Sequence, residues 1–343
     1  MENNIQESIL TDNKMNWQVE KIPALHYHPT KKHQEIKGHY FIRRKDNLKI
    51  LGAVKSSYVP TQNKDTFNYI LEIVKDYPNV NLQDVIIKSF NEGRKVCFMF
   101  RIEDIKIGKV ISENYIYAIS SHDGSSRLAF GLCNKVIGCA NMFPMLLSDI
   151  TATKFKHTSN VPKKIKDIDL KTHIQQYVLG CSALYKKMFY TPVNVNIINE
   201  TICRMLGIDK WIAKNIHKFD EKYLHSPENT TGHFIKIKDN DYILSNFAIS
   251  NIRFTSDLNN ISSHRDITID IRLAKKVKEL NKHIADENFI HGTNYYGLFN
   301  GLTRYANRNM KIDRENGKLE SVMLGKGSKF MKKGFELIIN KIK

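Results

Sequence analysis

Three pairs of apolar segments in the first 133 residues are each joined by a short polar turn, and this pattern limits the possible folds more than any other feature. The pairs are residues 39–44 with 48–60, residues 84–90 with 94–102, and residues 115–121 with 127–133. Their turns contain Asp46-Asn47, Asn91-Glu92-Gly93 and His122-Asp123-Gly124-Ser125-Ser126. Turn-forming residues between alternating apolar runs predict antiparallel hairpins.

The segment 61–78 has a different pattern and predicts a helix. Its apolar face would consist of residues at helical spacing, namely Phe67, Ile70, Leu71 and Val74. The expected cap is Thr61 or Asn63, and the expected terminus is Pro78. Residues 141–150 predict a second, shorter helix.

Helical periodicity dominates beyond residue 169. Six segments are amphipathic at helical spacing, and they are residues 169–190, 195–208, 210–224, 267–284, 294–310 and 329–342. Residues 232–254 are ambiguous and are expected to hold short strands. We therefore predict an α+β fold with three parts. These are an antiparallel-sheet-rich domain at residues 1–152, a basic linker or loop at 153–168, and a mainly helical basic region at 169–343.

Composition narrows the class of protein. The 343 residues suffice for about two domains of roughly 150 residues, and the apolar fraction of 41% argues against disorder. No run of about 18 apolar residues predicts a membrane helix, and the first residues carry no apolar signal segment. The five cysteines form no CxxC motif, which favours reduced thiols. We expect a cytoplasmic protein with no membrane partner and no cofactor.

The formal net charge of +18 is unevenly distributed. Residues 1–150 carry a net +4 and residues 151–343 a net +14. A surplus of this size favours a polyanion partner, because phosphate contacts release condensed counterions. A solvated basic surface without such a partner is the alternative.

The turn at His122-Asp123-Gly124-Ser125-Ser126 is the most distinctive stretch. Its residues are first of all turn formers, since Gly supplies a positive φ and Asp and Ser bond the turn's own amides. A phosphate contact that includes Arg127 is a second reading. A catalytic pair of His122 and Asp123 is a third, although adjacent residues on a strand point to opposite faces.

Basic residues surround an aromatic one in the segment 153–166. They are Lys154, Lys156, His157, Lys163, Lys164 and Lys166, with Phe155 among them. Cations that hold the backbone and an aromatic ring that stacks on a base are typical of single-strand binding. A solvated linker is the alternative reading.

Three further motifs have weaker signals. The run Gly325-Lys326-Gly327-Ser328-Lys329 lacks the first glycine of a phosphate loop, so we expect it to open the last helix and to offer Lys326 and Lys329 to an anion. The N-terminal histidines have no nearby cysteine and lie among lysines, so no metal site is predicted; they are His26, His28, His33 and His39. Asn300 and Thr303 share one side of a helix with aromatic residues and need partners if they are buried.

Several stretches, in this order, resemble a phage- and plasmid-encoded family described as domain of unknown function number 932. They are NWQVEKIP (16–23), LGAVKSSYVPTQNKDTF (51–67), GRKVCFMFRI (93–102), SSHDGSSRLAFGLCNKVIGCANMF (120–143), KFKHT (154–158), NYYGLFNGLTRYANR (294–308) and MLGKGSKFMKKGFELI (323–338). The resemblance is weakest at residues 190–290. Gly301 stands where the family tends to have Ala, which would weaken that helix by up to about 1 kcal/mol. The resemblance implies a mobile element and a cytoplasmic role but supplies no reaction.

The expected function is that of a non-enzymatic nucleic-acid-binding protein that acts on DNA in phage or plasmid replication or recombination, by single-strand binding or annealing. The expected contacts are Arg127, Lys154, Phe155, Lys156, His157, Lys163, Lys164, Lys326 and Lys329. One alternative is a metal-dependent nuclease or other hydrolase that uses His122 and Asp123, although no paired-acid motif lies near them. Another is a virion or host-interaction protein. The sequence leaves a homo-oligomer open.

Overall fold

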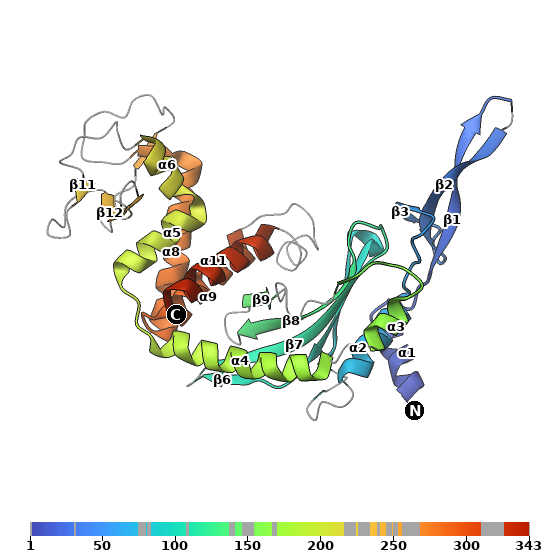
Figure 1. The fold of residues 1–343 in the computed structure, drawn as a ribbon, viewed down its shortest axis with the longest axis horizontal. Helices are drawn as coiled ribbons and strands as arrows, with labels where there is room; N and C mark the ends of the chain where they lie inside the picture. Colours follow the sequence, from blue (N-terminus) through green and yellow to red (C-terminus); the bar gives the residue numbers. More distant parts are fainter. Residues whose placement is uncertain are drawn as a thin grey trace. The chain divides into compact units, whose positions relative to one another are not determined.

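The structure is a computed structural model, and it forms two compact units. Unit 1 extends from the N-terminus to Ser182, and unit 2 begins at Ala183 and includes the C-terminal helix. Antiparallel strands dominate unit 1 and helices dominate unit 2, so the predicted α+β class is confirmed (Figure 1). The structure describes residues 2–30, 32–74, 80, 84–107, 110–136, 141–145, 154–166, 170–215, 224–225, 234–238, 241–244, 249, 253–255, 268–309 and 326–342.

Unit 1 begins with a helix and a three-stranded antiparallel sheet. The elements are α1 (Glu2–Asp12), β1 (Val19–His28), β2 (Lys32–Arg44) and β3 (Ile50–Lys55), and the strand order is β1-β2-β3. The hairpin of β2 and β3 confirms the first predicted pair of strands. Strand β1, which the sequence did not predict, pairs along β2 and forms a long two-stranded hairpin with it (Figure 1).

A larger antiparallel sheet forms the centre of unit 1. Its strands are β4 (Ile86–Phe90), β5 (Lys95–Arg101), β6 (Ile105–Ile107), β7 (Val110–Ser121), β8 (Leu128–Val136), β9 (Asn141–Met145) and β10 (Lys154–Phe155). The main order is β10-β8-β7-β5-β4, with β6 beside β7 and β9 beside β8. The pairs β4–β5 and β7–β8 confirm the other two predicted hairpins.

The predicted helix at residues 141–150 is wrong over its first half. Residues 141–145 form β9, which pairs antiparallel with β8 from Val136 to Leu132. The unpaired edge of β8 offers these residues backbone hydrogen bonds, and an apolar run this short has no helical preference strong enough to compete. Residues 146–150 lie outside the described residues.

Helix α2 (Asn63–Val74) packs on one face of the larger sheet. Phe67, on its apolar face, lies with its ring centroid 5.9 Å from that of Phe98 and 5.2 Å from that of Phe100. The expected cap is not formed, because both candidate side chains are used elsewhere. The Thr61 hydroxyl bonds Nδ1 of His157, and the Asn63 amide donates to the carbonyl of Met15. The expected end of this helix, Pro78, lies outside the described residues.

The predicted linker at 153–168 is part of unit 1. Its residues form β10, which pairs with β8, and then α3 (Val161–Lys166). The boundary between the units lies further along the chain, within α4 (Leu170–Tyr190). Apolar residues in the segment explain the difference, since Phe155, Val161 and Ile165 are all buried in the core of unit 1.

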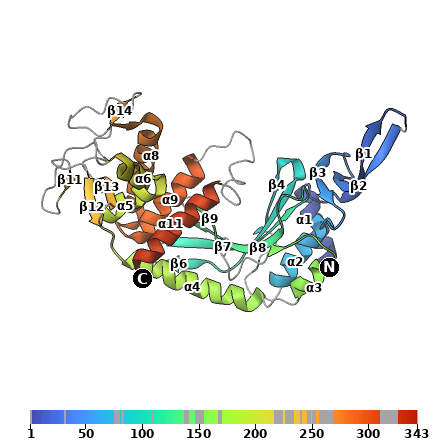
Figure 2. The ribbon, with the colours of Figure 1, turned by 45° about the horizontal axis from the view of Figure 1, so that its top comes forward.

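Unit 2 is built around helices, as predicted. They are α5 (Val195–Leu206), α6 (Ile208–Asn215), α8 (Ile271–His291), α9 (Tyr295–Asn309) and α11 (Lys326–Ile342). Short strands accompany them (Figure 2), and these are β11 (Leu224–His225), β12 (Phe234–Lys238), β13 (Asp241–Leu244), β14 (Arg253–Thr255) and β15 (Thr268–Asp270). The expectation of short strands within 232–254 is therefore correct.

Gly301 has a packing role that its helix propensity does not reveal. A Cβ at this position would lie 2.5 Å from Cα of Ile284 and 2.9 Å from the backbone N of Ile284. A contact that close to backbone atoms does not occur in real proteins, so α8 and α9 approach each other over this glycine. The cost that glycine brings to the isolated helix is therefore offset by the tight packing of the two helices.

Candidate nucleic-acid interface

The turn after β7 is held by its own side chains. Gly124 has a φ of +72°, which favours glycine. The Asp123 carboxylate accepts hydrogen bonds from the Ser121 hydroxyl and from the backbone N of Ser125, the latter at 2.9 Å. Burial raises the pKa of Asp123, but these hydrogen bonds and nearby Lys95 outweigh burial and hold the pKa below its usual value. Asp123 is therefore ionised and bonded within the turn.

Replacing Asp123 by Ala tests this role. We expect Asp123→Ala to lower the free energy of unfolding by about 1 kcal/mol, since the turn loses acceptors for two donors that can partly turn to water. Chemical denaturation of the full chain measures the change. A variant as stable as the parent would show that the turn does not depend on the carboxylate.

His122 is a core residue, although it belongs to a polar turn motif in the sequence. Its side chain is 0% exposed, and Nε2 donates to Oδ1 of Asn63 at 2.9 Å. Asn63 in turn donates to the Met15 carbonyl at 3.1 Å, and the His122 ring lies edge-on to Trp17. The imidazole thus ties the end of β7 to the start of α2 and to the N-terminal segment.

Two further segments with the family-like motifs converge on this turn. A Cβ at Gly52 of β3 would lie 2.5 Å from Cα of Asp123, so that strand passes directly against the turn. Tyr58 donates its hydroxyl hydrogen to the Ser121 carbonyl at 2.7 Å. The Tyr58 ring also lies 5.0 Å from the ring of His157, whose carbonyl accepts from the backbone N of Val59 at 2.9 Å. The motifs at 51–67, 120–126 and 154–158 therefore form one packed cluster.

Neither histidine of this cluster is suited to acid–base chemistry near neutral pH. Burial, and secondarily the neighbouring His157, lowers the pKa of His122 to about 3. Burial likewise lowers the pKa of His157 to about 4. The His122 imidazole bonds Asn63, whereas the Asp123 carboxylate bonds Ser121 and Ser125, so the two neighbours do not form a dyad. The geometry favours the turn reading of this motif over the catalytic one.

Basic side chains gather at the edge of the larger sheet, next to this cluster. Strand β10 pairs with β8 at Lys154↔Ala129 and Phe155↔Leu128, so Lys156 directly follows β10 and Arg127 directly precedes β8 at the same end of this pairing. Helix α3 follows within the same segment and carries three lysines, among them the exposed Lys163 and Lys164. We name these exposed residues the basic edge, and they are Arg127, Lys154, Lys156, Lys163 and Lys164. Among the described residues, none of their side chains forms a salt bridge.

Two residues that the sequence assigned to this interface are not on it. Phe155 is 5% exposed, and its ring lies 6.0 Å from that of Phe130 in the core. His157 is 5% exposed and bonds Thr61 at 3.1 Å. Alternation along the extended backbone turns these two side chains inward and the lysines beside them outward. The prediction that Phe155 stacks on a base is therefore wrong for this fold.

Lys326 and Lys329 belong to unit 2 and so form a separate region. Both are exposed in the first turn of α11, whose start at Lys326 confirms that the glycine-rich run opens the last helix. Further along the helix, Lys333 donates to the carbonyl of Arg204 and Lys341 to the carboxylate of Glu200. These later lysines hold α11 to α5.

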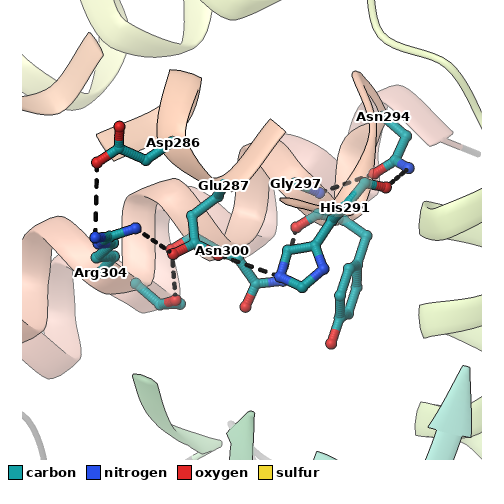
Figure 3. A network of polar contacts seen from close by, with 9 residues as sticks. Asp286, Glu287, His291, Asn294, Gly297, Asn300 and Arg304 are labelled. Atoms are coloured by element: carbon teal, nitrogen blue, oxygen red, sulfur yellow. Dashed lines mark hydrogen bonds and ion pairs between the residues drawn. The ribbon is translucent and has the colours of Figure 1, made fainter. Parts of the chain in front are cut away.

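Sequence reasoning missed a buried ionic network between α8 and α9 (Figure 3). The Glu287 carboxylate is 0% exposed and accepts from Nη1 of Arg304 at 3.0 Å. Nε2 of His291 lies 3.2 Å from the same carboxylate, and Nη2 of Arg304 lies 3.6 Å from Asp286. The only sequence signal is the spacing of Glu287 and His291 by one helical turn, because Arg304 comes from the next helix.

The predicted need for buried partners at Asn300 and Thr303 is met within α9. The Asn300 amide donates to the Tyr296 carbonyl at 2.9 Å, and the Thr303 hydroxyl donates to the Asn300 carbonyl at 2.9 Å. Both side chains are buried. They satisfy helix carbonyls and are not exposed to a ligand.

The described residues contain neither a metal-binding group nor a membrane-spanning helix. No three His, Cys, Asp or Glu side chains among the described residues are grouped so that they could hold a metal ion. The helices in these residues include none that is long and apolar enough to span a bilayer.

Unit 1 is therefore an α+β domain in which the packed cluster around the turn after β7 lies next to the basic edge. Residues 50–210 match the family described as Domain of unknown function (DUF932), so the resemblance is confirmed over this range. Neither curated protein sequences nor solved structures give a match to the chain. The matched range contains the turn, the basic edge, α5 and the start of α6.

Proposed function

We propose that the chain is a nucleic-acid-binding protein that acts on DNA, by single-strand binding or annealing, in the replication or recombination of a phage or plasmid. Its place of action would be the cytoplasm of the host cell. The observation that carries the proposal is the basic edge, where five cationic side chains of unit 1 are exposed. Arg127 directly precedes β8, Lys154 and Lys156 lie on and directly after β10, and Lys163 and Lys164 lie on α3.

Charge and shape both support a phosphate backbone as the ligand. Basic side chains that form no salt bridge among the described residues repel one another unless a polyanion lies near. Strand pairing and helix α3 already order most of the backbone that carries them, so little backbone freedom is lost on binding. With Phe155 buried, the interface binds through phosphates and not through stacking on that ring.

Oligonucleotide binding across a salt series tests the proposal. Five phosphate contacts on a single strand would make the affinity fall about 100-fold between about 50 and 200 mM salt, because each contributes roughly 0.7 to the logarithmic slope. Fluorescence anisotropy with a labelled single strand measures this slope. Absence of binding at low salt, or an affinity independent of salt, would contradict the proposal.

The same experiment separates the other classes of function. Incubating the oligonucleotide with the protein and magnesium should leave it intact, whereas cleavage would favour a metal-dependent nuclease. A protein that binds no nucleic acid and leaves it intact would instead suit a virion or host-interaction role. Light scattering with and without oligonucleotide would show whether the chain forms a homo-oligomer, which an annealing protein can use to hold two strands.

A further inference from the structure

The hairpin of β1 and β2 extends beyond the sheet that supports its base. Strand β3 pairs with β2 only over residues 39–43, while β1 and β2 continue to pair with each other from Leu25↔Glu35 to His28↔Lys32. Along β2, the first fully buried side chain is Ile42. We call residues 25–37 the ribbon. The pairing shifts register between Pro23 and Leu25, and Gly38 has a φ of +77°, so an irregularity sets the ribbon apart from its base.

Three large apolar side chains of the ribbon are exposed to solvent. Leu25 is 51% exposed, Tyr27 70% and Ile36 40%. Leu25 and Tyr27 share one face of the ribbon, where the Tyr27 ring lies edge-on to that of His33. An isolated two-stranded hairpin is at best marginally stable in water, so a ligand that covers this one would also stabilise it.

The positive charge of the ribbon favours a polyanion as the ligand that covers it. The ribbon contains three lysines and three histidines, with Glu35 as its sole acidic residue. Lys32 and Lys37 are exposed, and among the described residues neither forms a salt bridge. An acidic partner is therefore favoured over a membrane interior or a second copy of this basic chain.

The shape of the ribbon favours a duplex as the form of the nucleic acid. Two strands lie about 4.8 Å apart, and a two-stranded ribbon fits the major groove of a duplex, which is about 12 Å wide. We infer that the ribbon binds in the groove of a nucleic-acid duplex, with lysines on the phosphates and the apolar side chains against base edges. This inference rests on the proposed function and adds a second contact to it. A protein that holds a single strand at the basic edge and a duplex at the ribbon would bind both the substrate and the product of annealing.

The test compares the full-length parent chain with two ribbon variants on matched duplex and single-stranded oligonucleotides. Lys32→Gln/Lys37→Gln should lower the salt slope on the duplex by about 1.8, since each lost contact removes roughly 0.9. Tyr27→Ala should weaken duplex binding several-fold at every salt without changing that slope. Neither variant should alter single-strand binding. The control is Lys88→Gln/Lys106→Gln, which removes the same charge from exposed positions on β4 and β6.

The outcomes are separable. Ribbon variants that bind duplex as the parent does would overturn the inference and leave the proposed function standing. An equal loss on both oligonucleotides, or a loss matched by the control, would overturn it as well, because the ribbon would then be part of a general basic surface. A change of oligomeric state in the ribbon variants would show that a second copy covers the ribbon. A parent chain that binds neither oligonucleotide would refute the proposed function itself.

Discussion

Phe155→Ala is expected to lower the free energy of unfolding of unit 1 by about 3–5 kcal/mol, and to leave the nucleic-acid affinity of the folded protein unchanged. The ring is 5% exposed and packs against Phe130 beneath the edge of the larger sheet. Its removal would leave a cavity in the core beside Phe130 that neighbouring side chains fill only in part. Denaturant unfolding of the full chain measures the loss, and anisotropy measures the affinity.

Phe289→Ala is the matched control for this prediction. It makes the same substitution at a ring that is 92% exposed, so we expect a change within about 0.5 kcal/mol. Suppose instead that Phe155→Ala keeps its stability but binds a single strand more weakly at every salt concentration. The ring would then be a stacking platform, and the buried position described for it would be wrong.

Acidification is expected to cost unit 1 about 4 kcal/mol of stability between about pH 7.5 and pH 5. Burial lowers the pKa of His122 to about 3 and the pKa of His157 to about 4, against an ordinary value of 6.5. Each folded imidazole therefore binds fewer protons than the unfolded one, and stability falls as the pH drops below the unfolded pKa. At pH 5, protonation of each histidine stabilises the unfolded state by about 2 kcal/mol relative to the folded state. Each pH unit below the unfolded pKa of 6.5 contributes about 1.4 kcal/mol.

Removing one of the two imidazoles isolates this effect. His157→Gln should reduce the loss between the two pH values by about half, because only His122 then titrates with unfolding. His33→Gln makes the same substitution at an exposed position on β2 and is the matched control. Denaturation midpoints at both pH values provide the measurement. An unchanged pH dependence in His157→Gln would contradict the burial of this residue.

The local elements were predictable from the sequence because their signals are local. Each hairpin has its turn residues between its two strands, and α2 shows its buried face in the spacing of Phe67, Ile70 and Val74. The irregular segments could not be predicted from the sequence, since their structure depends on distant partners. Strand β10 has two residues, and it exists because β8 offers an unpaired edge.

The candidate site was predicted in outline and corrected in detail. Lysines next to Phe155 have the same sequence pattern whether the ring faces solvent or the core, and the fold alone decides between them. His122 reads as an exposed turn residue, yet its contact with Asn63 joins residues 59 positions apart. Gly301 was assigned a cost from helix propensity, while its role lies in the approach of Ile284 from another helix. The ion pair of Glu287 and Arg304 likewise depends on the packing of two helices.

The central claim is that unit 1 holds a single strand along its basic edge. The most direct test is the salt slope of single-strand affinity for Lys154→Gln/Lys156→Gln, measured beside Lys88→Gln/Lys106→Gln. The first pair lies on and beside β10 at one edge of the larger sheet, and Lys88 lies on β4 at the other. We predict that the slope falls by about 1.4 in the first variant and stays at the parent value in the second, at unchanged melting temperature. Equal slopes in the two variants would contradict the account.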